Sequence, residues 1–65
     1  MILNVRKIKV LLAENKLSCY AFAKKSGFSR QAISRMFKRG TCGYVNAGRL
    51  AEALGVSVSE ITEEE

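Results

Sequence analysis

The 65-residue sequence contains no histidine, no proline and only two cysteines, Cys19 and Cys42. Histidine is the commonest general base in enzymes and the usual activator of a catalytic nucleophile, so its absence argues against catalysis. Two cysteines without histidine supply neither a disulfide framework nor the four ligands of a structural zinc site. We therefore expect a protein that is not an enzyme, with two free thiols and with neither a metal nor another cofactor.

Long apolar runs are also missing. The longest ones, VLLA and MIL, are far shorter than the roughly 20 apolar residues that a membrane-spanning helix needs. Charged residues are interspersed with the apolar ones at the N-terminus, and no small-residue cleavage site follows, so the pattern is not that of a signal peptide. The sequence predicts a cytoplasmic protein without a membrane partner.

Acidic residues are scarce outside the C-terminal end. All eleven Lys and Arg residues lie from Arg6 to Arg49 together with one acid, Glu14, whereas the segment from Leu50 onward carries five acids and no base. Residues 24–39 include six basic residues and no acid, a pattern typical of a surface that binds a polyanion. A basic face that only keeps the protein soluble is the alternative.

Apolar residues recur at helical spacing along the chain, and caps and glycines mark where the helices begin and end. The lack of proline, repeats and linkers predicts one compact all-α domain over residues 1–65, with four to five helices and no strand. Because negative charge at a helix C-terminus opposes the macrodipole, we expect the acidic tail at 62–65 to fray. The expected helices run from an Asn4 cap to about Asn15, from a Ser18 cap to Lys25, from a Ser29 cap to Arg39, through Ala47–Leu54 before Gly55, and from a Ser57–Glu60 capping box.

The helix expected after Ser29 is the most polar one. At 100° per residue, Ile33, Met36 and Phe37 share an inward stripe, and Phe22 and Phe28 are also expected in the core. An amide, a hydroxyl and two cations project outward on the opposite face, from Gln31, Ser34, Arg35 and Lys38. Gly27 and Phe28 make a tight turn in front of this helix. A helix with such a face fits the DNA major groove, which is about 12 Å wide.

Residues 19–38, within a helix-turn-helix over about 18–39, resemble the twenty-residue motif of the Cro and cI repressor family, which is lambda-repressor-like and of XRE type. Ala23 occupies its small position, Gly27 opens its turn and Ile33 packs back. The strings SGFSRQAISR and RLAEALGVSVSEI are both similar to members of that family. Two departures affect local stability. Ser26 replaces an aliphatic residue, and Ala21 lacks the carboxylate that caps the second helix in many members.

The resemblance implies two sets of DNA contacts. Arginine offers a bidentate fork to guanine and glutamine one to adenine, and serine hydroxyls reach bases or phosphates. The base-reading set is Arg30, Gln31, Ser34 and Arg35. The phosphate set comes from the N-termini of the second and third helices, the end of the third helix and the following loop. Its members are Ser18, Cys19, Ser29, Lys38, Arg39, Thr41 and Tyr44. Tyr20 is a weaker candidate, equally well interpreted as a ring lying on the surface or against the first helix.

The predicted function is sequence-specific binding of double-stranded DNA by a small transcriptional regulator, a repressor of bacterial or phage origin without a small-molecule ligand. Family members of this kind read palindromic operators as homodimers, and the interface is expected in residues 41–46 or 56–61. One alternative is an antitoxin-like or partner-binding helix-turn-helix module that docks an acidic protein. Another is a non-specific nucleic-acid binder, which the scarcity of exposed aromatic residues disfavours.

Overall fold

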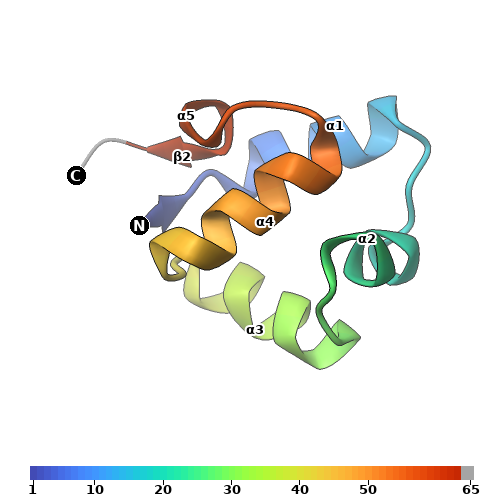
Figure 1. The fold of residues 1–65 in the computed structure, drawn as a ribbon, viewed down its shortest axis with the longest axis horizontal. Coiled ribbons are helices and arrows are strands. Elements are labelled where there is room, and N and C mark those ends of the chain that lie inside the picture. The colour runs from blue at the N-terminus through green and yellow to red at the C-terminus, as the bar shows by residue number, and fades with distance from the viewer. Residues whose placement is uncertain (64–65) are drawn as a thin grey trace.

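The computed structural model describes residues 1–63, which form five helices and a two-stranded sheet (Figure 1). The all-α class is confirmed, since every predicted helix is present and the strands are short. In chain order the elements are β1 (Ile2–Leu3), α1 (Val5–Glu14), α2 (Cys19–Ser26), α3 (Arg30–Arg39), α4 (Tyr44–Leu54), α5 (Val58–Ile61) and β2 (Thr62–Glu63).

The predicted caps account for where the helices begin. The Ser18 hydroxyl accepts a hydrogen bond from the Ala21 N–H at 3.1 Å, and the Ser29 hydroxyl accepts one from the Ala32 N–H at 3.1 Å. Each such cap stabilises a helix by about 1 kcal/mol. The side chain of Asn4 caps α1 in the same way. The start of every helix up to α3 is therefore encoded locally.

The end of α4 and the start of α5 also have the caps that the sequence predicts. The Val56 N–H donates to the Ala51 carbonyl oxygen at 3.1 Å, which gives the predicted Schellman end of α4 beside Gly55. The predicted capping box begins α5, where the Ser57 N–H donates to the Glu60 carboxylate at 3.3 Å. α4 begins at Tyr44, before the start at Ala47 that its apolar residues predict.

The small sheet was not predicted. β1 pairs antiparallel with β2, so that Leu3 lies opposite Thr62. The expectation that 62–65 would fray is thus wrong for the two residues of β2, while 64–65 lie outside the described residues. Leu3 is buried, and a buried backbone N–H requires a partner, which for Leu3 is the Gly40 carbonyl oxygen and not a group of β2. Strands of two residues are too short to show the alternation by which a sequence reveals a strand.

The N-terminal segment also contacts the end of α3. The Leu3 N–H donates to the Gly40 carbonyl oxygen at 2.8 Å, and Ile2 forms a bridge with Thr41. These hydrogen bonds connect the chain beyond α3 to β1. The C-terminal end of α3 is therefore fixed by backbone contacts as well as by side-chain packing.

A single core positions the helices. Its largest fully buried side chains come one from each helix, namely Ile8, Phe22, Ile33, Leu50 and Ile61. α4 packs against α2 on one side and α5 on the other (Figure 1). Phe28 and Phe37, predicted as core, are half-buried and pack against it. No helix within residues 1–63 is long and apolar enough to span a membrane.

Candidate nucleic-acid interface

The turn between α2 and α3 is built by three residues. Gly27 ends α2 in the left-handed conformation with φ 80°, which glycine adopts without the steric strain of other residues. The Phe28 N–H then donates to the Ala23 carbonyl oxygen at 2.9 Å, and Ser29 caps α3. This geometry lets α3 cross α2 after a connection of three residues, which is a helix-turn-helix.

The two departures from the family pattern are accommodated in α2. Ser26 is buried, and its hydroxyl donates to the Phe22 carbonyl oxygen at 2.7 Å, so the buried hydroxyl has a partner. Ala21 provides no carboxylate, but its own N–H is satisfied by the Ser18 hydroxyl. Helix α2 is therefore capped at its start without an acidic residue.

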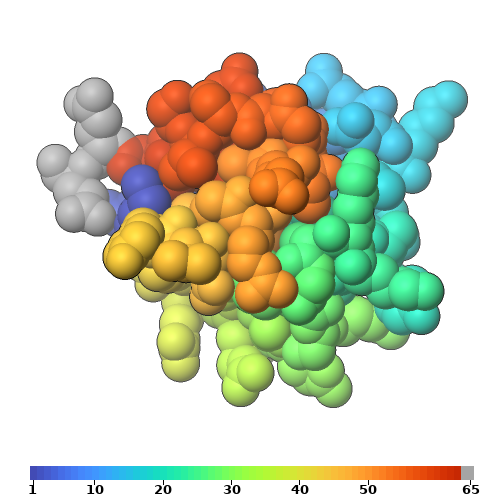
Figure 2. Space-filling model, viewed as in Figure 1, coloured from blue at the N-terminus to red at the C-terminus, as the bar shows by residue number. Residues whose placement is uncertain are grey.

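Helix α3 separates an inward from an outward face as the helical wheel predicts. Ile33 and Met36 are buried, whereas all four residues of the base-reading set are exposed. All seven residues of the phosphate set are exposed too. Figure 2 shows side chains of the α3 segment projecting from the lower edge of the molecule. The exposed polar face is thus available to a partner, and its contacts with DNA stay a prediction.

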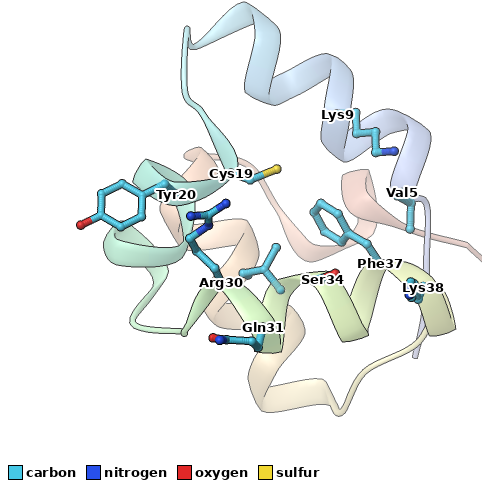
Figure 3. A pocket seen from close by; sticks show the side chains of 10 residues that line it. Val5, Lys9, Cys19, Tyr20, Arg30, Gln31, Ser34, Phe37 and Lys38 are labelled. Carbon is cyan, nitrogen blue, oxygen red and sulfur yellow. The ribbon is translucent and has the colours of Figure 1, made fainter.

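A groove with a volume of about 870 Å³ lies between α1, α2 and α3 (Figure 3). It brings together five predicted site residues from two helices, namely Cys19, Arg30, Gln31, Ser34 and Lys38. The apolar residues Val5, Ile33 and Phe37 also line it, and among residues 1–63 no acidic residue does. A negatively charged group in this groove would meet cations without a competing carboxylate.

The other arginines of α3 lie apart from that groove. Arg35 and Arg39 line a smaller hollow between α3 and α4, next to Phe28, Met36 and Asn46. The base-reading set is therefore distributed over both sides of the exposed ridge of α3. Four predicted phosphate contacts line neither hollow: Ser18, Ser29, Thr41 and Tyr44.

The sequence did not indicate that α1 contributes to the groove. Lys9 and Val5, one helical turn apart on α1, line the groove together with α3. Lys9 is exposed and adds a third cation to those of Arg30 and Lys38. No local signal distinguishes Lys9 from the other basic residues of α1, because the side of α1 that faces α3 is decided by tertiary packing.

Tyr20 contacts cations on the surface. The residue is 55% exposed, and its ring centroid lies 5.6 Å from Lys24 Nζ and 6.0 Å from Arg30 Cζ. Figure 3 shows the phenol hydroxyl pointing away from the groove. Tyr20 is thus an exposed ring whose cationic neighbours are Lys24 and Arg30, and its contact with a phosphate stays a prediction.

The two cysteines are free and differ in environment. Cys19 is exposed at the start of α2, whereas Cys42 is half-buried. Burial raises the pKa of the Cys42 thiol, and the positive N-terminus partly opposes this rise. Within residues 1–63, no group of three or more His, Cys, Asp or Glu side chains is placed to hold a metal ion.

Comparison with known proteins identifies the family. The model of the family described as Cro/C1-type HTH DNA-binding domain matches residues 7–64. The chain therefore belongs to this family of helix-turn-helix DNA-binding domains. The predicted resemblance is confirmed, and with it a general role in DNA binding. Searches of curated proteins and of solved structures return no match.

Proposed function

We propose that the protein is a sequence-specific repressor of the small Cro/cI kind, which inserts α3 into the major groove of double-stranded DNA. The observation that carries this proposal is the division of α3 into two faces. Ile33 and Met36 attach the helix to the core, while Gln31, Ser34 and Arg35 are exposed on its outer side. These side chains offer the donors and acceptors that distinguish base pairs in that groove.

The phosphate set would fix the register of α3 on the duplex. Hydrogen bonds to phosphates position a protein on DNA but carry no sequence information directly. Ser18 and Cys19 lie at the N-terminus of α2, where N–H groups and the helix dipole favour an anion. Lys38 and Arg39 lie in the last turn of α3. Together they would bind the backbone on both sides of the inserted helix.

The operator is proposed to be a palindrome bound by a homodimer, because helix-turn-helix dimers read two half-sites about one helical turn apart. The dimer interface stays proposed for residues 41–46 or 56–61. In the first of these segments Tyr44 is 78% exposed and Val45 60% exposed, which favours it. Such a repressor acts on bacterial or phage DNA in the cytoplasm, as one domain spanning 1–65 and without catalysis.

Selection from randomised double-stranded DNA by the purified protein, at two salt concentrations, tests this function. We expect enrichment of a short inverted repeat that persists at the higher salt, since base contacts are less sensitive to salt than phosphate contacts. Failure to enrich any sequence, with binding lost as salt rises, would contradict sequence-specific recognition. Sedimentation of the protein with the selected DNA then shows whether two copies bind.

A second candidate is a partner-binding or antitoxin-like module. The observation that favours it is the mixed lining of the groove, where Val5 and Phe37 lie among the cations Lys9, Arg30 and Lys38. Such a groove suits an acidic protein segment that also carries apolar side chains. The test measures the affinity of an acidic partner for the free protein and for the protein saturated with the selected DNA. Equal affinities would mean that the partner uses another surface, and this candidate would be wrong.

A further inference from the structure

Arg49, on α4, contacts the turn between α2 and α3. Its Nη2 donates a hydrogen bond to the Gly27 carbonyl oxygen at 3.0 Å. Its guanidinium carbon also lies 4.3 Å from the centroid of the Phe28 ring. One side chain therefore contacts two consecutive residues of the turn through a hydrogen bond and a cation–π contact. In Figure 2 the orange surface of α4 adjoins the green surface of this turn.

The space that Arg49 occupies exists because residue 27 is a glycine. A Cβ atom on Gly27 would collide with the Arg49 guanidinium. By contrast, a Cβ on Gly40 or on Gly55, which also have positive φ, would meet nothing within 4 Å. Gly27 thus meets two requirements, the left-handed backbone and the close approach of a side chain from α4.

We propose that Arg49 is a positioning residue for DNA recognition, which orients the start of α3 without touching DNA. This proposal rests on the proposed function. Phe28 directly precedes Ser29, the N-cap of α3, and Arg30 and Gln31 follow. Because recognition geometry must be held within about 0.5 Å, a contact that fixes Phe28 relative to α4 also fixes where those side chains begin.

The competing role for Arg49 is an ordinary phosphate contact, and salt dependence separates the two. A phosphate contact contributes about 0.9 to the slope of log affinity against log salt and acts on every DNA sequence. A positioning residue leaves that slope unchanged and acts on the cognate sequence. In the structure the guanidinium already donates to a carbonyl and covers a ring, which favours positioning.

The first test compares Arg49→Met with Arg6→Met, which removes the same charge from an exposed residue of α1 that lines neither hollow. For Arg49→Met we expect at least about a fivefold loss of affinity for the selected DNA, the loss of one misplaced base contact. Its affinity for unrelated DNA and its slope of log affinity against log salt should match those of Arg6→Met. Equal losses on both DNAs with a reduced slope, or no loss, would overturn the proposal.

Arg49→Lys is the second test variant, to be used if Arg49→Met does not fold. Lysine retains the charge and a donor but lacks the planar guanidinium that stacks on Phe28. We expect it to lose part of the discrimination between cognate and unrelated DNA with an unchanged salt slope. Full discrimination with lysine would mean that charge alone suffices, and the proposed stacking contact would be wrong.

A test without DNA keeps this inference separate from the proposed function. If the wild-type protein selects no sequence, the proposed function fails, but the coupling between Arg49 and α3 is still measurable by amide NMR. We expect Arg49→Met to shift the amide resonances of residues 29–33 relative to wild type. Adding Phe28→Leu to Arg49→Met should shift these resonances little further. Shifts confined to the neighbours of Arg49 on α4 would overturn the inference.

Discussion

The guanidinium carbon of Arg30 lies 6.0 Å from the centroid of the Tyr20 ring, a contact between the first residue of α3 and the second residue of α2. Lys24 approaches the same ring. The ring therefore gathers two cations beside the groove and restricts where the first base-reading side chain can lie. At an exposed site such a cation–π contact contributes about 0.5–1 kcal/mol.

Replacing Tyr20 tests this contact. We expect Tyr20→Leu to weaken binding of the selected DNA about two- to fivefold, the equivalent of one exposed cation–π contact. Tyr20→Phe retains the ring and should bind like the wild type. Fluorescence anisotropy with labelled DNA measures both variants. If Tyr20→Phe loses as much affinity as Tyr20→Leu, the hydroxyl rather than the ring makes the contact that matters.

Two glycine variants separate backbone strain from the Arg49 contact. Gly27→Ala and Gly40→Ala both place a side chain in the left-handed region, at a cost of roughly 1–2 kcal/mol. Only Gly27→Ala also displaces the Arg49 guanidinium, so we expect it to lower the melting temperature further. Circular dichroism measures both transitions. In an Arg49→Met background the extra loss should disappear, and its persistence would locate the strain elsewhere.

Ser26→Ala is expected to stabilise the protein. The Ser26 hydroxyl donates back to the Phe22 carbonyl within α2, a contact that slightly destabilises helices. Alanine has a helix propensity about 0.5 kcal/mol more favourable than serine. The melting temperature should rise by a few degrees, since about 1 kcal/mol corresponds to 4–8 °C for a domain of this size. A fall would show that the buried hydrogen bond outweighs the propensity.

The two thiols should differ in reactivity. The raised pKa of Cys42 lowers its thiolate fraction at any pH below that pKa, and its half-buried position limits access, whereas Cys19 is exposed in the groove. A chromogenic disulfide reagent at pH 8 should therefore modify Cys19 first. Bound cognate DNA should slow that reaction in Cys42→Ser, which leaves one thiol. Modification at the same rate with and without DNA would remove Cys19 from the interface.

The sequence predicted the parts of the fold that are encoded locally. The caps at Ser18 and Ser29 and the glycine ends of the helices involve residues three or four positions apart, so their signals lie within short segments. The inward stripe of α3 was predicted for the same reason. The family resemblance then supplied the site residues, whose exposure the structure shows.

The structural features that the sequence did not predict depend on contacts between residues far apart in the chain. Arg49 and Gly27 are 22 positions apart, and Arg49 appeared in the sequence only as one more cation. Lys9 lines the groove because of how α1 packs on the other helices. The pairing of β1 with β2 joins the two ends of the described chain through strands of two residues. None of these contacts has a periodicity that a sequence could reveal.

The most direct test of base reading by α3 is a parallel DNA selection with the wild type, Gln31→Ala and Lys38→Ala. We expect the consensus of Gln31→Ala to lose its preference at one position of each half-site, because one bidentate contact is gone. Lys38→Ala should keep the whole consensus and bind every sequence more weakly, with a smaller salt slope. An unchanged consensus for Gln31→Ala, or the same uniform weakening in both variants, would contradict the claim that the outer face of α3 reads bases.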